Sequence, residues 1–289
     1  MSRVDEQFEE QRASNASGLP YYDVFASHRV QQTRLIRAAA VRGQGAGGER
    51  LCVLGAGNAY DLELEELLTV FAEVHLVDID AAAVIRARQR VPEGPRQRVF
   101  AHAPVDLSGW FQHLERWGRM QVTPQELMVA PAAGAKAIAA ALPGPFDVVV
   151  STCLLTQLQL SLLQLIGERH QLFVALREFL TLTHLRTLAA LTKPGGRALL
   201  VTDLCERAVF PPGRPSGEAD LAPLMQELVT AGHVIHSSHP ELIKITLGDD
   251  PVLARTFAPA ELSAPWLWQN GPGRCFLVYA LLLSQQLGA

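Results

Sequence analysis

Short apolar runs alternate with stretches of helical periodicity through most of the chain. The runs are short enough for strands, whereas the stretches between them repeat apolar residues at the spacing of a helix. We expect strands at 51–54, 74–77, 98–101, 146–151, 197–202, 266–269 and 275–283, and helices at 24–42, 62–71, 81–91, 107–119, 124–141, 156–192, 219–231 and 251–257. This alternation predicts an α/β fold with a doubly wound, mostly parallel sheet.

The pattern changes near both ends of the chain. A glycine-rich segment at 43–48 separates a polar start and one helix from the alternating region. We therefore predict an N-terminal helical arm or cap at 1–45 and a main domain at 46–289. The last two expected strands flank a tight turn at 271–273, which predicts an antiparallel C-terminal hairpin.

Composition narrows the class of protein. The chain has 289 residues, 48% of them hydrophobic and 19% charged, and a net charge of -4. Such a balance is typical of globular proteins and gives no electrostatic footprint for nucleic acid. The four cysteines form no CxxC pair, and neither a signal peptide nor a membrane-spanning run is evident. We expect a soluble, cytoplasmic protein that does not associate with a membrane.

The strongest local signal follows the strand at 51–54. That strand runs into Gly55-Ala56-Gly57, and a helix is expected shortly afterwards. Glycine allows positive φ and close approach of a ligand to the backbone, as a nucleotide-binding turn requires. A plain strand-to-helix turn would also use glycine. In the dinucleotide pattern GxGxxG the third glycine falls at Tyr60, whose ring would obstruct the pyrophosphate, so binding of NAD is disfavoured.

An acidic residue ends the next strand. Asp78 lies about 20 positions after Gly55, the offset at which a carboxylate meets the hydroxyls of a ribose. A carboxylate can accept from both vicinal hydroxyls at once. A turn or capping function would explain the same residue, and we assign that function to Asp80, before the helix at 81–91.

From about residue 50 to the end, the sequence resembles the class I S-adenosylmethionine-dependent methyltransferases. Five segments occur in the family's order, with Ala59 at the third small position of the first motif: Gly55-Ala56-Gly57, Asp78, Val105-Asp106-Leu107, 146–151 and 191–196. The resemblance implies a seven-stranded Rossmann-like sheet with an antiparallel C-terminal hairpin strand. It also implies S-adenosylmethionine as cofactor, bound by Gly55, Ala56, Gly57, Asp78, Asp106 and Ser151, with Asp106 near the adenine. Asp61 and Glu63 are further candidates near the methionine end.

Methyl transfer needs a positioned acceptor more than a fixed set of catalytic groups, because the cofactor carries the activated methyl group. A general base is optional. The weak candidates for catalysis are Tyr21, Tyr22, His28 and Thr152. The first three belong to an aromatic stretch of the arm, which could be a lid over the acceptor or a cap that packs on the sheet.

Polar residues after the fourth and fifth strands are candidates for the acceptor site because parallel strands bind ligands at their carboxyl ends. They are Ser151, Thr152 and Cys153, and Asp203, Cys205 and Glu206. Loop polarity and helix capping would account for them equally. We expect no metal site. His233, His236 and His239 precede Pro240, where a helix would be ending, and we interpret them as a solvated loop.

The sequence favours transfer of a methyl group to a nitrogen or oxygen atom of a small molecule. Two alternatives stay open: an NAD-dependent oxidoreductase on a similar sheet, and a non-catalytic cofactor-binding regulatory protein. A nucleic-acid acceptor is disfavoured by the absence of a basic stripe. The oligomeric state is not predicted.

Overall fold

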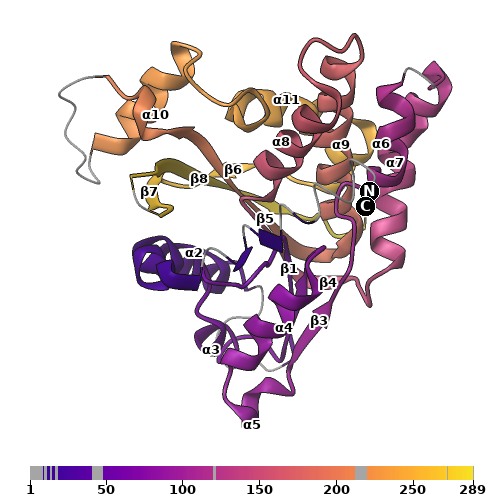
Figure 1. Cartoon of the computed structure of the whole chain (residues 1–289). Helices are drawn as coiled ribbons and strands as arrows, with labels where there is room; N and C mark the ends of the chain where they lie inside the picture. The colour runs from indigo at the N-terminus through magenta and orange to yellow at the C-terminus, as the bar shows by residue number, and fades with distance from the viewer. Residues whose placement is uncertain are drawn as a thin grey trace.

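An eight-stranded β-sheet runs through the centre of the protein (Figure 1). The computed structural model describes residues 9, 12–13, 15–16, 19–40, 48–119, 122–211, 220–271 and 273–288. The strand order is β3-β2-β1-β4-β5-β8-β6, and β7 also pairs with β8. The strands are β1 (Arg50–Leu54), β2 (Glu73–Val77), β3 (Val99–His102), β4 (Phe146–Thr152), β5 (Thr192–Glu206), β6 (Glu261–Leu262), β7 (Trp266–Gln269) and β8 (Cys275–Ser284).

The first five strands are parallel and the C-terminal ones are antiparallel. β1 lies between β2 and β4, so the chain reverses direction across the sheet after β3, as in doubly wound folds. β8 pairs antiparallel with β5, and the other edge of β8 is covered in turn by β6 and β7. The predicted fold class is confirmed. Seven strands were expected; the two-residue β6 is too short to leave a hydrophobic pattern.

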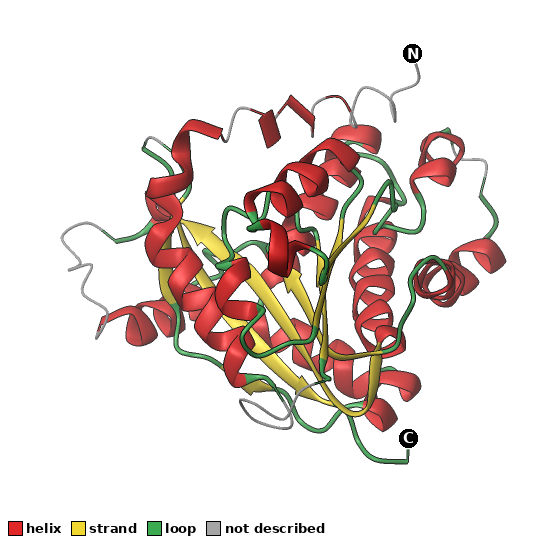
Figure 2. Ribbon diagram, turned by 90° about the horizontal axis from the view of Figure 1, so that it is seen from below, coloured by secondary structure: helices red, strands yellow, loops and turns green. Residues whose placement is uncertain are grey.

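Helices cover both faces of the sheet (Figure 2). Alternation along β1 shows why: Leu51 and Val53 face one core, whereas Cys52 and Leu54 face the other. The first core takes α2 (Ala26–Ala38), α3 (Leu64–Leu67) and α4 (Ala81–Arg90). The second takes α6 (Phe111–Gly118), α7 (Pro124–Ala140), α8 (Leu154–Ile166), α9 (Phe173–Leu191), α10 (Leu221–Thr230), α11 (Pro240–Asp249) and α12 (Pro251–Thr256).

Two helix predictions need correction. The helical region expected at 156–192 is two helices, α8 and α9, and α8 ends where Gly167 adopts a φ of +80°. Pro240 was expected where a helix ends, but it is the first residue of α11. Proline is well suited to that position because the N–H it lacks would have no partner inside the helix. Short helices at α5 (Glu93–Arg96) and η4 (His236–Ser238) were also missed.

The arm packs against the main domain. A 3-10 helix, η1 (Leu19–Phe25), leads into α2, and both contact β7, while α2 also contacts α3. The boundary predicted between residues 45 and 46 falls within 41–47, which lie outside the described residues. Among the described residues, none of the helices combines the length and the apolar character that a membrane crossing requires.

Candidate functional site

The glycine loop leaves β1 and crosses the end of β2. The backbone N–H groups of Gly55 and Ala56 both donate to the carbonyl oxygen of Val77, at 3.0 and 3.1 Å. Gly55 and Gly57 have φ values of +73° and +47°. These lie in the left-handed region that side chains disfavour, so the sequence needs glycine at both positions.

Ala59 has the same unusual backbone conformation. Its φ is +49°, and its side chain is 1% exposed. A non-glycine residue in this region is strained by about 1–2 kcal/mol, and it persists only where its surroundings hold it. The small residue expected at this third position of the motif therefore sits where the turn requires one.

Asp78 joins the loop to the second strand. Its Oδ2 atom accepts from the N–H of Gly57 at 2.8 Å, and its Oδ1 atom accepts from the N–H of Asp80 at 2.9 Å. The side chain is buried, and this burial raises the pKa of the carboxyl group. Each carboxylate oxygen can accept two hydrogen bonds, so both retain capacity for a ligand hydroxyl.

The neighbouring acids differ in what they bind. Asp80 accepts from the N–H groups of Ala82 and Ala83 at the start of α4, so its predicted capping function is confirmed. Asp106 accepts from the N–H and hydroxyl of Ser108 through Oδ1, and from the N–H of Phe111 through Oδ2. Asp106 thus orders the turn that leads into α6, and its contact with adenine stays a prediction.

Ser151 lies inside the sheet rather than at its edge. Its side chain is fully buried, and its hydroxyl is hydrogen-bonded to Nε2 of His184 in α9 at 2.8 Å. Burial lowers the pKa of His184 to about 4, so this imidazole is neutral at physiological pH. The expectation that Ser151 binds cofactor stays a prediction, and the structure gives its hydroxyl another partner.

The arm is bound to the segment that follows the glycine loop. Arg29 pairs with Glu63 at 2.5 Å and donates to the carbonyl oxygen of Tyr60 at 3.0 Å. Gln32 donates to Asp61 at 2.9 Å, and burial raises the pKa of that carboxyl group. Asp61 and Glu63, the candidates for the methionine end, are therefore held by α2.

Asn15, which precedes η1 in the arm, packs against the glycine loop. The side-chain amide of Asn15 donates to Oδ2 of Asp80 at 2.9 Å, and the backbone carbonyl oxygen of Asn15 accepts from the side-chain amide of Asn58 at 2.6 Å. A Cβ atom added to Gly57 would lie 3.3 Å from Oδ1 of Asn15. Asn15 of the arm thus lies in the space that a side chain at position 57 would need.

The described side chains among the weak candidates for catalysis make contacts with other residues of the protein. The ring of Tyr22 lies under the guanidinium group of Arg29, 3.9 Å from the ring centroid. His28 is fully buried, and its Nδ1 atom accepts from Nε1 of Trp266 at 2.9 Å. Thr152 donates to the carbonyl oxygen of Gly55 at 3.0 Å, which joins β4 to the glycine loop. The side chain of Tyr21 lies outside the described part.

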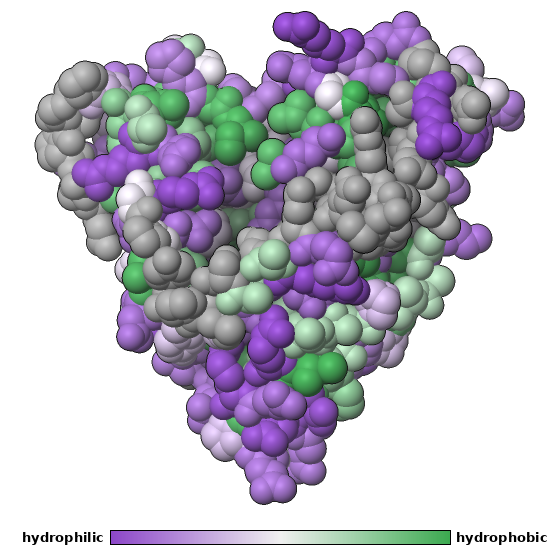
Figure 3. Space-filling model, in the orientation of Figure 1, coloured by the Kyte–Doolittle hydropathy of each residue, from purple (hydrophilic) through white to green (hydrophobic). Residues whose placement is uncertain are grey.

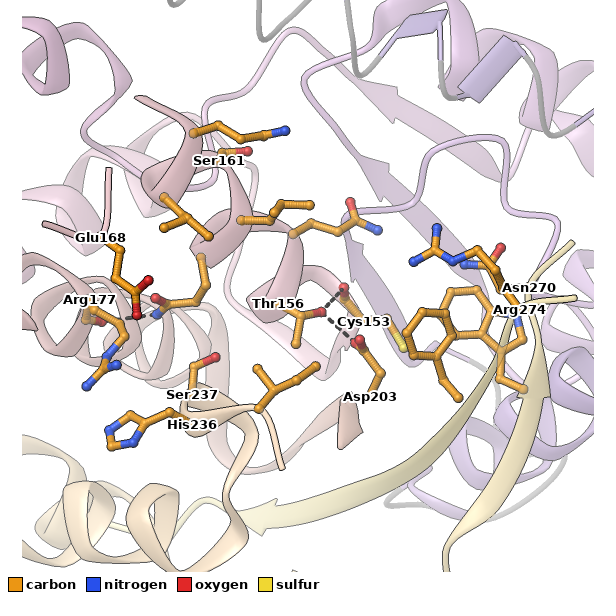
Figure 4. A pocket seen from close by; sticks show the side chains of 18 of the residues that line it. Cys153, Thr156, Ser161, Glu168, Arg177, Asp203, His236, Ser237, Asn270 and Arg274 are labelled. Carbon is orange, nitrogen blue, oxygen red and sulfur yellow. Dashed lines mark hydrogen bonds between the residues drawn. The ribbon is translucent and has the colours of Figure 1, made fainter. Parts of the chain in front are cut away.

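A cavity of about 670 Å³ opens beside the carboxyl ends of β4 and β5 (Figure 4). Its inner part contains Cys153, Thr156 and Asp203, and its outer part contains Glu168 and Arg177. The hairpin β7–β8 supplies Trp268, Asn270, Arg274 and Phe276. On the face shown in Figure 3, apolar side chains gather on both sides of a notch between the α10 and α8 sides of the molecule.

The inner end of the cavity is next to the glycine loop. Cys153 follows Thr152 and has a φ of +47°, so the chain turns sharply from β4 into α8 there. The hydroxyl of Thr156 lies 2.5 Å from Oδ1 of Asp203. Burial raises the pKa of Cys153, and the charges of Asp203 and Asp61 raise it further. Two carboxyl groups, those of Asp203 and Asp61, therefore lie near the inner end of the cavity.

Sequence reasoning selected part of this cavity. Cys153 and Asp203 were candidates because they were expected to follow strands; Asp203 instead lies within β5, which continues to Glu206. Thr156 was missed, although its place in the first turn of the helix after β4 was a usable signal. Trp268 and Phe276 left no signal, because only the folded hairpin brings them here. His233 and His236 are exposed and His239 is half-buried; the described residues contain no group of three or more potential metal ligands.

No protein-family model matches the chain, and no curated protein matches it. Solved structures do resemble it, at low identity. A proposed S-adenosyl-L-methionine-dependent methyltransferase from Methanococcus maripaludis is 9% identical, with 96% of this chain and 94% of that one covered and a TM-score of 0.49. An rRNA methylase from Streptococcus thermophilus is 11% identical, with coverages of 89% and 96% and a TM-score of 0.40. The CurJ carbon methyltransferase is 14% identical, with coverages of 100% and 62% and a TM-score of 0.47.

These similarities are too weak to transfer a residue, a ligand or an acceptor to this chain. The fold is established by its own topology: five parallel strands in doubly wound order, extended by the antiparallel β8. A positive-φ glycine turn follows β1, and a buried acid follows β2. The chain accordingly has the Rossmann-like fold of the class I S-adenosylmethionine-dependent methyltransferases.

Proposed function

We propose that the protein transfers a methyl group from S-adenosylmethionine to a nitrogen or oxygen atom of a small molecule. The observation that carries the proposal is the position of Asp78. Its carboxylate is buried at the end of β2, and it holds the N–H of Gly57 at 2.8 Å. A hydrogen-bond acceptor beside a glycine turn after the first strand is the arrangement that nucleotide-binding sheets use, and it supports the proposal.

The residues at the loop fit a nucleoside with a charged side chain. Asp78 keeps acceptor capacity on both oxygens for the ribose hydroxyls. Gly55, Ala56 and Gly57 supply a turn with little or no side chain. Asp61 contributes negative charge near the cavity, since it acts on Cys153. Negative charge favours a sulfonium ion, so the electrostatics of this edge agree with the proposed cofactor.

The cofactor supplies an activated methyl group, and the protein's share of the work is to orient the acceptor and exclude water. The cavity suits that task because Cys153, which lines it, directly follows Thr152, and the hydroxyl of Thr152 contacts Gly55. A volume of about 670 Å³ is within the usual range for small-molecule sites. The net charge of -4 supports a small acceptor over a nucleic acid.

The arm belongs to the proposed site as a cover. Asn15 lies against Gly57 and Asp80, and Arg29 and Gln32 bind the segment after the loop. A cover of this kind would shield the transferred methyl group from water. The alternative in which α2 is only a packing element predicts no change in the arm when cofactor binds.

Titration calorimetry tests the proposal. We expect S-adenosylmethionine and S-adenosylhomocysteine to bind with dissociation constants well below about 1 mM, and NAD not to bind at that concentration. Binding of NAD without either methionine-derived ligand would favour the oxidoreductase. Binding of S-adenosylmethionine without methylation of any component of a metabolite extract would favour the non-catalytic alternative.

A further inference from the structure

The cavity beside β5 ends in a buried carboxylate with an unused oxygen. Asp203 is 7% exposed and lines the cavity. Its Oδ1 atom is bound by the hydroxyl of Thr156 at 2.5 Å. Across the described part of the chain, no other residue donates a hydrogen bond to Oδ2. Oδ2 is therefore available to a donor group on a ligand in the cavity.

The two arginines that line the cavity form ion pairs with carboxylates other than Asp203. Arg177 pairs with Glu178 at 3.1 Å, and Arg274 pairs with Glu206 at 3.5 Å and lies 5.2 Å from the ring centroid of Phe276. Arg274 influences the Asp203 carboxylate through space, and within the described ranges no cation forms an ion pair with it. Asp203 is therefore left to pair with a positive group on a ligand.

A second carboxyl group, that of Asp61, acts on the same inner end of the cavity. The charges of Asp203 and Asp61 both raise the pKa of Cys153, which lies between the cavity and the glycine loop. An anionic acceptor, such as a carboxylate or a phosphate, would be repelled there. A protonated amine would be attracted.

The side chains that form the walls of the cavity favour a ligand with an apolar body. Trp268 and Phe276 form one side, with ring centroids 5.7 Å apart. Leu160 and Leu163 also line the cavity and are 53% and 37% exposed. Apolar side chains of this kind remain exposed where a ligand or partner covers them.

We infer that the acceptor is an amine with an aromatic or other apolar body, and that Asp203 holds its nitrogen at the inner end of this cavity. The inference rests on the proposed function and adds the substrate class. The ammonium group gives a proton to Oδ2 of Asp203. The freed lone pair then bonds to the methyl carbon, and the carbon–sulfur bond breaks with its electron pair going to sulfur. The product is a methylated ammonium ion, so each turnover releases one proton.

Asp203 is suited to that exchange. Burial raises the pKa of its carboxyl group, which makes the carboxylate a stronger base than an exposed aspartate. The groups around it are Cys153, Thr156, Cys205, Tyr279 and Arg274. Burial and the charge of Asp203 raise the pKa of Cys205 to about 12, and burial raises that of Tyr279. Neither group competes for the proton near neutral pH.

A matched set of ligands tests the inference without any mutation. Phenethylamine, tryptamine, phenethyl alcohol and hydrocinnamate are titrated into the wild-type protein saturated with S-adenosylhomocysteine, and ligand-detected NMR measures binding. We expect the two amines to bind at least about tenfold more tightly than the alcohol, and the carboxylate not to bind. Equal binding of amine and alcohol, or tighter binding of the carboxylate, would overturn the inference.

Two variants then locate the amine. Asp203→Asn should weaken amine binding at least about tenfold and leave the alcohol unchanged, with affinity for S-adenosylhomocysteine preserved. Asp249→Asn makes the same change at an exposed residue and should leave amine binding within about twofold of wild type. Asp203→Glu should restore part of the affinity. Unchanged amine binding in a folded Asp203→Asn protein contradicts the inference.

The proposed function and the substrate class can be overturned separately. Cofactor affinity is measured first, with no acceptor present, and its absence would contradict the proposed function alone. Labelled methyl transfer from S-adenosylmethionine to tryptamine, with loss in Asp203→Asn, would support both. Cofactor binding together with methylation of phenols or carboxylic acids but of no amine would overturn the substrate class and retain the methyltransferase.

Discussion

The backbone N–H of Gly57 donates to Oδ2 of Asp78 at 2.8 Å, so the acid after β2 helps to form the loop after β1. The other oxygen holds the N–H of Asp80, the residue that caps α4. Asp78 therefore connects the two segments that make up the proposed cofactor site. A substitution there affects the shape of the loop as well as the ligand, and both effects can be measured.

Asp78→Asn should weaken binding of S-adenosylhomocysteine by about 1–3 kcal/mol, because one oxygen and the negative charge are lost while the size of the side chain is kept. The thermal midpoint should also fall, since Oδ1 and Oδ2 both accept backbone N–H groups. Calorimetry and a thermal melt on the same preparation separate the two effects. Asp249→Asn is the control, and unchanged affinity in a folded Asp78→Asn protein would make Asp78 a turn residue only.

Ala59→Gly should be nearly neutral for stability. The substitution removes a buried methyl group but relieves a φ of +49°, and these effects roughly cancel. Ala87→Gly is the matched control, since Ala87 is equally buried but lies inside α4. Urea unfolding should show Ala87→Gly to be at least about 1 kcal/mol more destabilising. Equal losses would mean that Ala59 does not adopt the left-handed conformation.

Arg29→Met should loosen the arm. Arg29 is 6% exposed, and its loss leaves the carboxylate of Glu63 and the carbonyl oxygen of Tyr60 without this donor. Because Glu63 is partly exposed, we expect about 1–3 kcal/mol rather than the full cost of an unpaired buried charge. Limited proteolysis should cut the arm sooner. Arg37→Met, which breaks the exposed pair with Glu66 at 2.9 Å on the same helix, should cost less than about 1 kcal/mol.

The free energy of unfolding should decrease as the pH is lowered from 6.5 to about 4, because of His184. Its pKa in the folded protein is lowered from 6.5 to about 4 by burial, so in this range the unfolded chain binds a proton that the folded protein does not. The contribution is complete above pH 6.5, and at about pH 5 roughly 2 kcal/mol has been lost. In His184→Gln that part of the slope should disappear. Parallel urea curves for variant and wild type across this range would contradict the assignment.

The sequence predicted the features that depend on local patterns, namely the strands and the glycine loop. The strands of the sheet were found because each buried strand contains a short apolar run, as at 148–150. The glycine loop was found because its conformation restricts the residues allowed there. Residues placed by resemblance fared less uniformly: Asp106 and Ser151 lie near the expected elements, but their side chains bind Ser108 and His184. A resemblance locates a position along the chain, whereas the direction of a side chain depends on its packing partners.

The cavity could be predicted only in part. Thr156 and Asp203 are separated by a complete helix–strand unit, and the rings of Trp268 and Phe276 come from a hairpin formed much later in the chain. Their meeting depends on the antiparallel pairing of β8 with β5. That pairing is set by the tertiary fold, and no spacing in the sequence encodes it.

His28 and Trp266 share a buried hydrogen bond of 2.9 Å although they stand near opposite ends of the sequence. On the ribosome, the segment that contains His28 emerges long before Trp266 has been made. The arm therefore has no complete seat until synthesis has passed the hairpin, and the cover over the glycine loop is among the last parts to assemble. A nascent chain interrupted before β7 would have the glycine loop, Asp78 and the contacts of α2 with Asp61 and Glu63, but would lack the contacts of α2 with β7. In such a chain the buried imidazole of His28 would lack its partner Trp266, so full-length synthesis is a condition for a closed site.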